Sequence, residues 1–564
     1  MNSVGRPGRE SWGPPRVVET HGALIFLCGD EAHKVRKPLD LGFLDNRTVR
    51  ARAEQSRREV ELNSRLAPDV YTGVLEVRGP DDEVIEHVVR MRRLPDRDSL
   101  AAIVRSREQG PGGSRDTDVV GDGRGPGVSD ADRVREAGGR SVAEGVREVA
   151  RQIARLHADS PRTPEIDAAG DPDVIAGLWA ESLEHLRRLS VGEDAPEIVD
   201  DMEMLATAYL RGRGPLLRSR IEAGRIVDGH GDLLAADVYL TEDGPRIIDC
   251  LEFDDRLRFG DAMLDIGFLA MDLDRSGATD LAVVVLAAYR EASGDDAPPS
   301  LVHHYMGYRA LVRAKVTAIR AAQAADTVPT GDAGPSGPAH ADPAHAEAVA
   351  VAAAEARRAL ELADRAVDAL LWGRVRLVLV GGVSGSGKST LARPLAQELG
   401  AELLRSDEVR QELRAGHGTA GGYSAGAVDA VYSELLARAA GMLAHGRSVV
   451  LDATWLDPRR RAEAETVAAD AHAELVEISC TAHRDELARR ITERARTGSD
   501  PSEATVEVLD AQLAELAPWP DAIEVDTTAL DVRDADAVVT WAARELGPLP
   551  WAHLDPAHHL RRVR

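Results

Sequence analysis

The segment that most constrains this 564-residue chain is the run Gly-Val-Ser-Gly-Ser-Gly-Lys-Ser at residues 382–389. An apolar run at 376–380 precedes it, and residues 390–400 have the composition of a helix. This order matches the pattern G-x-x-x-x-G-K-[ST] in its strand–loop–helix setting. Glycines let the main chain curl so that successive N–H groups point inward, and the helix N-terminus adds a positive dipole end. The segment therefore predicts a loop that binds phosphate groups.

The residues of this loop and of the first helical turn are predicted to contact a nucleotide: Gly382, Gly385, Ser386, Gly387, Lys388, Ser389 and Thr390. In this motif the lysine reaches the β- and γ-phosphates, and the following Ser hydroxyl ligates Mg²⁺. ATP and Mg²⁺ are therefore the predicted cofactors. The alternative is a glycine-rich turn without a ligand, which would not need the flanking strand and helix.

Apolar strands alternate with helical segments around this loop. The strands are expected at 376–380, 401–404, 448–452, 474–480 and 522–526. Such alternation is typical of a parallel sheet covered by helices. The fold predicted for residues 372–545 is an α/β P-loop NTPase domain with a parallel sheet.

Polar residues follow two of these strands, where a parallel sheet places its ligands. Asp407 comes after the second strand and could accept a proton from an acceptor hydroxyl, while Arg410 could bind an anionic part of the acceptor. Alternatively, Ser406 and Asp407 only cap a helix. Asp452 ends the third strand and is predicted as a second Mg²⁺ ligand, unless it merely closes that strand.

A basic helical segment near residue 490 could act as a lid. Four arginines lie within it, Arg489, Arg490, Arg494 and Arg496. A closing lid would bring positive charge over the transferring phosphoryl group. The alternative is a solvated basic helix face.

Residues 376–539 resemble the P-loop kinase family that includes polynucleotide-kinase-like and gluconate-kinase-like proteins. The matching features are the loop at 382–389, the run S-D-x-x-R at 406–410, Asp452 and the arginine-rich segment. The resemblance implies that Asp407 is the general base and that Arg410 contacts the acceptor. It implies Arg496 or a neighbour as the lid arginine.

A second motif lies near residue 230, in the sequence D-G-H-G-D-L-L-A-A-D at 228–237. The protein-kinase catalytic loop is H-R-D-x-x-x-x-N, in which Asp orients the acceptor hydroxyl and Asn holds a metal. His230 and Asp232 occupy the H and D positions, and Asp237 stands where Asn is expected. Asp249 ends a short strand at 246–248, where a metal-binding Asp would lie. The spacing indicates a catalytic loop, a hairpin and a metal carboxylate.

Residues 21–319 resemble the aminoglycoside-phosphotransferase-like kinases, and the whole chain looks most like bacterial proteins in which such a kinase is fused to a P-loop domain. The resemblance implies Asp232 as catalytic base and Asp249 as a Mg²⁺ ligand, with Asp237 able to ligate the metal at the cost of one more negative charge. It implies that Lys34 grips phosphate and that Glu59 is its helix partner, with Lys37 as a rival for Lys34.

Two departures from the kinase pattern leave a weak kinase, or a site that binds without turnover, as further interpretations. Asp237 replaces the expected Asn, and no G-x-G-x-x-G occurs near residues 20–29. Asp261, Asp265 and Asp272 form an acidic cluster that could attract a cationic acceptor or simply be solvated on a helix surface.

The N-terminal half is predicted to have a bilobal α+β fold like that of protein kinases. The predicted parts are an N-lobe at 1–108 (strands 23–28, 33–36, 70–77 and 84–91, helix 49–66), a flexible glycine-rich loop at 109–140, a helical C-lobe at 141–325, a linker at 326–345 and a connecting helix at 346–371. Gly, Pro, Asp and Ser dominate both breaks, which carry too few apolar residues to fold compactly.

Composition limits the partners of the chain. A net charge of −26 weighs against nonspecific attraction to nucleic acid or an anionic membrane. The three cysteines are too few and too scattered for a disulfide framework, and no apolar run reaches membrane-spanning length, so a cytoplasmic protein is expected. His157 and the pair His303 and His304 lack metal-ligand partners at useful spacing and are expected to be ordinary packing or surface residues. His483-Arg484-Asp485 spells H-R-D but is expected to be surface charge on a helix.

These features lead to one hypothesis with two rivals. The hypothesis is a two-headed ATP-dependent kinase that phosphorylates hydroxyl groups of small molecules, such as a sugar or an aminoglycoside-like compound. In the first rival the P-loop half phosphorylates nucleic-acid ends, for which Arg410, Arg459, Arg460 and Arg461 would supply charge. In the second, the N-terminal half is a non-catalytic sensor that regulates the P-loop domain.

Overall fold

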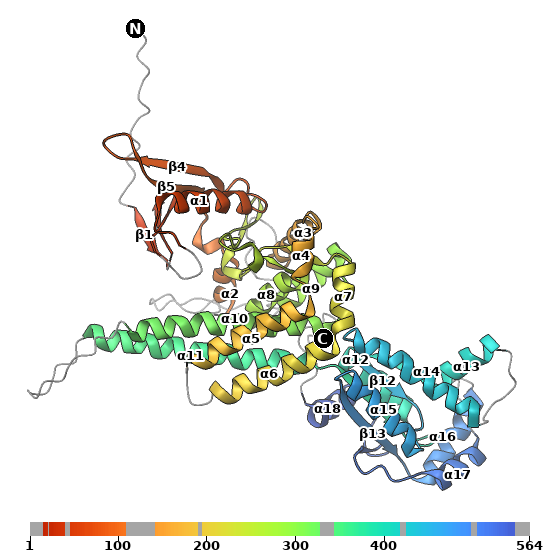
Figure 1. Cartoon of the computed structure of the whole chain (residues 1–564). Coiled ribbons are helices and arrows are strands. Elements are labelled where there is room, and N and C mark those ends of the chain that lie inside the picture. Colours follow the sequence, from red (N-terminus) through yellow and green to blue (C-terminus); the bar gives the residue numbers. More distant parts are fainter. Residues whose placement is uncertain are drawn as a thin grey trace, which may run out of the picture. The chain divides into compact units, whose positions relative to one another are not determined.

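A computed structural model describes residues 15–20, 22–39, 45–108, 141–189, 195–326, 343–417, 425–497 and 505–547 (Figure 1). The chain divides into two compact units, Met1–Ala169 with Ile226–Asp295, and Gly170–Arg225 with Asp296–Arg564. The predicted flexible loop at 109–140 and nearly all of the predicted linker at 326–345 lie outside the described residues.

The first unit begins with an antiparallel five-stranded sheet in the order β1-β2-β3-β5-β4. Its strands are β1 (Arg16–Glu19), β2 (Ala23–Cys28), β3 (Glu31–Arg36), β4 (Tyr71–Arg78) and β5 (Val84–Arg92). Alternate residues of β3 and β5, such as Ala32, Val89 and Met91, are buried in one core. This period-2 burial agrees with the strands predicted from the sequence.

Helix α1 (Val49–Asn63) packs against β4 and β5 of this sheet. Its first turn is capped by Thr48, whose hydroxyl accepts a hydrogen bond from the amide of Ala51. The buried residues of α1 include polar ones, and Glu59 is 1% exposed. A charged side chain is buried only where it has a partner, so this face of α1 belongs to a polar site.

The rest of the first unit is mainly helical around short strands. Its elements are α2 (Leu100–Glu108), α3 (Val142–Ala158), α4 (Pro164–Ala168), β6 (Ile226–Asp228), η4 (Ala235–Asp237), β7 (Val238–Thr241), β8 (Gly244–Ile247), η5 (Asp255–Leu257), β9 (Phe259–Asp261), α8 (Ala262–Arg275) and α9 (Thr279–Ser293). The strand β6 pairs antiparallel with β9, and β7 pairs antiparallel with β8. The predicted hairpin after the H-G-D motif is therefore present.

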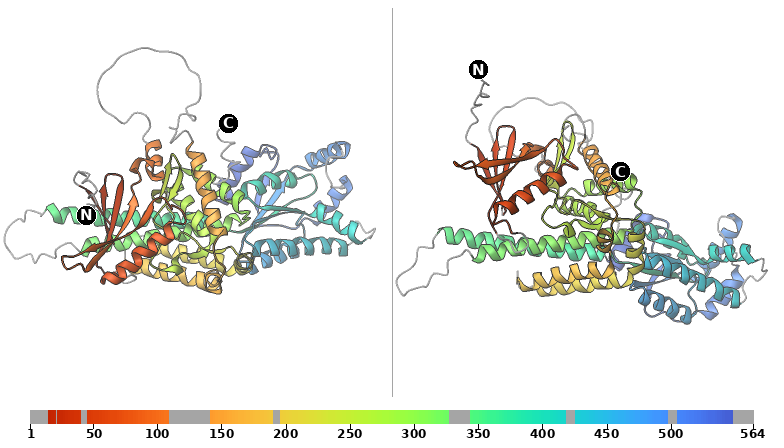
Figure 2. Two further views of the ribbon diagram at one scale, coloured as in Figure 1. Left: turned by 90° about the horizontal axis from the view of Figure 1, so that it is seen from above. Right: turned by 45° about the horizontal axis from the view of Figure 1, so that its top comes forward.

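The second unit contains long helices and a parallel sheet. Its helices before the sheet are α5 (Pro172–Arg188), α6 (Ala195–Gly212), α7 (Gly214–Glu222), α10 (Pro299–Asp326) and α11 (Pro343–Trp372). The last two lie side by side in both views of Figure 2. They also contact α5 and α6, so these helices group with the P-loop part and not with the rest of the predicted C-lobe.

The predicted parallel sheet is confirmed, with the strand order β11-β12-β10-β13-β14. Its strands are β10 (Arg376–Gly381), β11 (Glu402–Arg405), β12 (Val449–Asp452), β13 (Glu474–Thr481) and β14 (Ile523–Asp526). Its helices are α12 (Lys388–Leu399), α13 (Ser406–His417), α14 (Ala425–Ala444), α15 (Pro458–Asp470), α16 (Arg484–Thr497), α17 (Val506–Glu515) and α18 (Ala535–Leu546). All six residues of β10 are buried, as expected for the central strand of a sheet covered on both faces.

Among the described residues, none of the helices has the length and apolar character needed to cross a membrane.

Candidate functional site

The phosphate loop of the second unit adopts a main-chain path that only glycine can follow. The φ angles of Gly382, Gly385 and Gly387 are 135°, 81° and 88°. A Cβ atom at Gly382 would lie 2.5 Å from the carbonyl oxygen of Cys480, and one at Gly385 would lie 2.8 Å from that of Leu487. Left-handed φ and close backbone approach are the two situations that require glycine. The sequence pattern is thus explained by the fold of the loop.

Side chains from two other elements hold the loop from outside. The hydroxyl of Thr527, just after β14, donates to the carbonyl oxygen of Ser386 at 2.8 Å. Arg490 of α16 donates to that hydroxyl oxygen at 2.9 Å and to the carbonyl oxygen of Gly385 at 3.3 Å. The basic segment that was expected to form a lid therefore supplies one arginine to the support of the loop. Arg496, in the last turn of α16, is exposed.

The groups that remain available in the loop fit a nucleotide phosphate. Helix α12 begins at Lys388, and no described residue forms a hydrogen bond or ion pair with the ammonium group of this lysine. The hydroxyl of Ser386 is buried without a protein partner. Ser389 and Thr390 occupy the first helical turn, where free main-chain amides and the helix dipole favour an anion.

Asp452 ends β12 directly beside the phosphate loop, because it is paired in register with Val380 of β10. Its carboxylate is 3% exposed, and Oδ2 accepts a hydrogen bond from Nε of Arg405 at 3.1 Å. Oδ1 is buried without a hydrogen-bond partner. An unpartnered buried carboxylate oxygen next to a phosphate site fits a divalent cation, which is commonly held by one or two carboxylates together with phosphate oxygens.

Asp407, in the first turn of α13, pairs with Arg410, three residues later in the same helix. Nη1 of Arg410 lies 2.5 Å from Oδ1 of Asp407, and both side chains are mostly buried. The helix begins one residue earlier, at Ser406, so Asp407 stands inside its first turn. The structure thus brings the predicted base and the predicted acceptor contact together at the carboxyl end of β11, which ends at Arg405.

In the first unit, the H-G-D segment meets the predicted metal carboxylate through His230. Nε2 of this histidine lies 3.0 Å from the carbonyl oxygen of Ile248, and its own carbonyl oxygen accepts from the amide of Leu251 at 3.1 Å. These two bonds flank Asp249, which has a φ of 63°. The amide of Ile248 also donates to the carbonyl oxygen of Asp237 at 3.0 Å. The main chain therefore brings the segment that carries Asp232 and Asp237 next to the segment that carries Asp249.

Lys34 forms the ion pair that was predicted with Glu59 of α1. Its Nζ lies 2.8 Å from Oε1 of Glu59 and 3.5 Å from Oδ1 of Asp249. Lys37 pairs instead with Glu19 at 2.5 Å. The geometry therefore favours Lys34, and not its rival, as the lysine that faces Asp249.

Further charges surround this pair. Arg36 contacts Glu59 at 2.6 Å and Glu252 at 2.8 Å. Burial acts to lower the pKa of Lys34, but the carboxylates of Glu59, Asp249 and Glu252 outweigh it and raise the pKa above its usual range. The charge of Lys34 in turn lowers the pKa of Asp249. Lys34 is therefore a cation and Asp249 an anion at neutral pH, as phosphate and metal binding require.

Asp265 anchors the main chain of the H-G-D segment, a role that was not predicted from the sequence. Its carboxylate is buried and accepts hydrogen bonds from the amides of His230, at 2.5 Å, and Gly231, at 2.9 Å. Nε2 of His157 lies 3.2 Å from Oδ2 of Asp265. Burial acts to raise the pKa of Asp265, but the hydrogen bond with His157 and the amide donors lower it below its usual range.

The acidic cluster is thus buried and not solvated on a helix surface. Asp272 accepts from the amide of Ala235 at 3.0 Å, and Asp261 caps α8 through the amide of Met263 at 2.9 Å. All three carboxylates are buried. Asp265 and Asp272, seven residues apart, lie on one face of α8, and this periodicity was the signal in the sequence that could have indicated a shared helix face.

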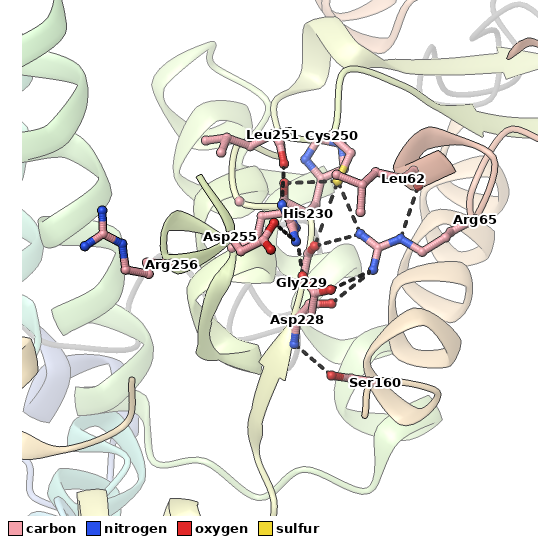
Figure 3. Close-up of polar contacts among 12 residues, drawn as sticks. Leu62, Arg65, Ser160, Asp228, Gly229, His230, Cys250, Leu251, Asp255 and Arg256 are labelled. Atoms are coloured by element: carbon pink, nitrogen blue, oxygen red, sulfur yellow. Dashed lines mark hydrogen bonds and ion pairs between the residues drawn. The ribbon is translucent and has the colours of Figure 1, made fainter. Parts of the chain in front are cut away.

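Arg65, just after α1, also contacts the H-G-D segment. It belongs to no motif identified in the sequence. It donates to the carbonyl oxygen of Gly229 at 3.2 Å and to Sγ of Cys250 at 3.3 Å, and it lies 3.4 Å from Oδ2 of Asp228 (Figure 3). Burial raises the pKa of the Cys250 thiol to about 11. This cysteine is therefore a packing residue behind the site and not a nucleophile.

The chain is similar in sequence to one protein family and to several known proteins. The family AAA_33, described as "AAA domain", matches residues 377–519. The chain is 37% identical over 519 residues to the proteins Rv2004c and MT2060 of Mycobacterium tuberculosis and Mb2027c of Mycobacterium bovis, covering 91% of this chain and 92% of each relative.

Solved structures resemble the chain more distantly. A choline/ethanolamine kinase family protein from Mesorhizobium loti is 16% identical with a TM-score of 0.32, covering 64% of this chain and 92% of its own. The APS kinase CysC of Mycobacterium tuberculosis, in complex with AMPPNP and APS, is 23% identical with a TM-score of 0.25, covering 31% and 99%.

Proposed function

This chain belongs to the family of the three mycobacterial proteins, and we propose that it is an ATP-dependent phosphotransferase with two kinase-type modules that phosphorylate hydroxyl groups of small molecules. The proposal depends above all on the position of Lys34, which lies 2.8 Å from Glu59 and 3.5 Å from Asp249. A lysine held between a helix glutamate and a metal-type aspartate is the arrangement that kinases use to grip ATP phosphates. The same chain also contains the phosphate loop at 382–389, in which three positions require glycine.

In the N-terminal module, Asp232 accepts the proton of the acceptor hydroxyl, and Lys34 binds phosphate oxygens. Asp237 and Asp249 would hold Mg²⁺, which supplies charge neutralisation on the phosphates. Asp265 positions the loop by binding its amides. Because the parts are held before substrate arrives, the rate comes from positioning and electrostatics.

In the C-terminal module, main-chain amides of the loop and Lys388 bind the nucleotide phosphates. Ser389 and Asp452 would hold Mg²⁺, since Oδ1 of Asp452 is buried without another partner. Asp407 is the proposed base and Arg410 the acceptor contact. Their mutual ion pair keeps both side chains in place at the sheet edge, and an anionic acceptor would compete with Asp407 for the arginine.

The contacts of three arginines favour a small-molecule acceptor over a nucleic-acid end. These arginines could have bound a phosphate backbone, but they have other partners. Arg459 pairs with Asp457 and Arg460 with Asp429. Arg461 is buried, with its guanidinium 4.9 Å from the ring centre of Trp519. Arg460 and Arg461 are engaged with neighbouring side chains, and Arg459, although its side chain is 86% exposed, is paired with Asp457. The three arginines therefore offer little uncompensated positive charge to a phosphate backbone.

The test measures ATP consumption by the full chain and by Asp232→Asn, Lys388→Ala and the double variant across sugars, aminoglycosides and oligonucleotides. We expect each single variant to lose one acceptor-dependent activity by about a hundredfold or more, and the double variant to lose both. Arg393→Ala, at an exposed position of the same helix as Lys388, is the control and should keep both.

Two results would contradict the proposal. If Lys388→Ala lost all activity while Asp232→Asn lost none, the N-terminal module would be a non-catalytic sensor. Asp237, in place of the expected Asn, suggests this interpretation. Turnover with oligonucleotides alone would make the P-loop module a nucleic-acid kinase.

A further inference from the structure

The second unit contains a cavity of about 290 Å³ that no part of the proposed reaction uses. Helices α6 and α10 and the end of α11 form one side of it, through residues such as Tyr209, His304 and Leu370. The segments that enter β10 and β13 form the other side, through Val375 and Glu474. The volume is near the lower end of the range for small-molecule sites.

The cavity lies at the opposite end of the sheet from the phosphate loop. Val375 immediately precedes β10 and Glu474 is the first residue of β13, so the cavity borders the amino ends of these parallel strands. The loop at Gly382 follows the carboxyl end of β10. A strand of this length spans roughly 20 Å. A ligand in the cavity would therefore not touch a nucleotide bound at the loop.

Arg213 brings an incompletely compensated positive charge to the cavity wall. This residue is 0% exposed, and its guanidinium donates only to main-chain carbonyls, at 2.7 Å to Ala471, at 3.2 Å to His472 and also to Leu443. These carbonyls lie at the C-terminal ends of α14 and α15, which carry partial negative charge. No described carboxylate pairs with the guanidinium, and its Nε is buried without an acceptor.

His304 brings a second donor. Nε1 of Trp179 lies 3.1 Å from Nε2 of His304. An indole N–H can only donate, so Nε2 accepts, and the proton of the neutral imidazole is on Nδ1. Nδ1 is buried without an acceptor, in a side chain that is 1% exposed. Two lining residues thus each keep one buried N–H that no protein group satisfies, and such groups normally have a partner.

Several of the other lining residues are aromatic or apolar and indicate which kind of ligand body would fit. The ring of Tyr209 stacks on His304 with centroids 4.3 Å apart, and Leu205 and Leu370 are apolar. The nearby carboxylate of Glu474 is occupied by Arg374, at 3.2 Å, and by Arg376, at 2.9 Å. We propose that this cavity binds a small organic carboxylate with a flat apolar body, at a site whose residues are separate from those of both proposed phosphoryl-transfer sites. The carboxylate oxygens accept from Arg213 and His304, and the apolar body lies against Tyr209 and the leucines.

A single carboxylate suits the cavity better than a phosphate group. Among the described lining residues, Arg213 and His304 are the two with a buried side-chain donor that lacks a partner, whereas a phosphate dianion needs several charge-assisted hydrogen bonds to offset its desolvation. The mainly apolar lining likewise favours one charged end on an apolar body.

The test is calorimetric titration of the full-length protein with benzoate and with benzamide, its uncharged analogue of similar shape, in the absence of nucleotide. We expect saturable binding of one benzoate per chain and binding of benzamide that is weaker by about tenfold or more, because a charged hydrogen-bond partner is lost. No saturable binding of benzoate would overturn the proposal and leave a cavity that holds only water. Equal binding of the two compounds would overturn the anion specificity.

Three variants locate the binding. Ala208 is an exposed lining residue, so Ala208→Trp should fill the cavity at little cost in stability and abolish benzoate binding. Met204→Trp, at a 61% exposed position of the same helix outside the lining, is the matched control and should bind normally. Lys388→Ala should also bind benzoate normally. If Lys388→Ala abolished binding, benzoate would occupy the nucleotide site, and the proposal would be wrong even if the phosphotransferase proposal stood.

Discussion

Nε2 of His157 lies 3.2 Å from Oδ2 of Asp265, and the same carboxylate accepts the amides of His230 and Gly231. Nδ1 of His157 is in turn 2.9 Å from the hydroxyl of Tyr289. A buried chain from Tyr289 to the H-G-D segment therefore fixes the backbone that carries Asp232. The proposed base sits on a turn whose main-chain amides are anchored by a carboxylate, not by packing alone.

Asp265→Asn is expected to lower the activity of the N-terminal module without removing any group that touches substrate. The amides of His230 and Gly231 donate to different oxygens of Asp265. Asn replaces one of these oxygens by an NH2 group that cannot accept, so one loop amide loses a charge-assisted hydrogen bond worth about 1.5–3 kcal/mol. The measurement is kcat and KM of the acceptor-dependent activity that Asp232→Asn removes. Asp243→Asn, exposed in the turn between β7 and β8, is the control. A fall in kcat equal to that of Asp232→Asn would show a direct role in proton transfer instead.

Glu59→Gln is expected to raise the KM for ATP of the same module and to destabilise the first unit. Lys34 and Arg36 both pair with this 1% exposed carboxylate, and removing one partner of a buried ion network typically costs about 3–5 kcal/mol. Urea unfolding and ATP titration in the Lys388→Ala background measure the two effects. Glu61→Gln, whose side chain is 68% exposed on the same helix, should change neither. An unchanged KM would mean that Lys34 does not grip the nucleotide.

Arg490→Met is expected to weaken nucleotide binding by the phosphate loop. The guanidinium supports the loop at Gly385 and through Thr527, and losing these bonds should cost about 1–3 kcal/mol, which is about 5- to 150-fold in affinity. Equilibrium binding of a non-hydrolysable ATP analogue provides the measurement. Arg489→Met changes a neighbouring arginine whose side chain is 59% exposed and should bind as the wild type does. If the two variants behaved alike, Arg490 would not position the loop.

Acid should destabilise the second unit through His304. Burial lowers the pKa of this histidine to about 3, whereas it is about 6.5 in an unfolded chain. Between these values the unfolded chain binds a proton that the folded one does not, so stability falls as the pH falls below about 6.5. The expected loss between pH 7 and pH 5 is about 2 kcal/mol.

Urea unfolding followed at both pH values measures this loss. In His304→Phe the difference between the two pH values should shrink by that amount, even if the variant is less stable overall. His185→Phe, at an exposed position of α5, is the control and should keep it. A pH dependence that is the same in His304→Phe and wild type would show that His304 does not titrate as its burial implies.

The local elements could be predicted because their patterns reflect short-range physics. β2 begins and ends where the apolar run at 23–28 does, and the strand–loop–helix at Gly382 follows from glycines that the loop geometry demands. The H-R-D at 483–485 opens α16 after a parallel strand, as its sequence context indicated. Spacing along one segment was sufficient for these features.

Contacts between distant segments could not be predicted in this way. Arg490 was expected in a lid, yet it supports the loop more than a hundred residues earlier. Asp265 and Arg65 hold the H-G-D segment, although neither belongs to a motif. The spacing of Asp265 and Asp272 fits one face of a helix but does not show what that face contacts.

The sequence by itself determined the glycine-rich loop motif at 382–389, the kinase-like H-G-D motif at 230–232 and the elements around them, because glycine conformation, strand alternation and helix periodicity act over a few residues. Only the tertiary structure decided which charged side chains form ion pairs. Lys34, and not Lys37, pairs with Glu59, and Asp407 pairs with Arg410. It also decided that Arg213 and His304 border one cavity. Burial converts such meetings into strong interactions, and burial depends on how remote segments pack.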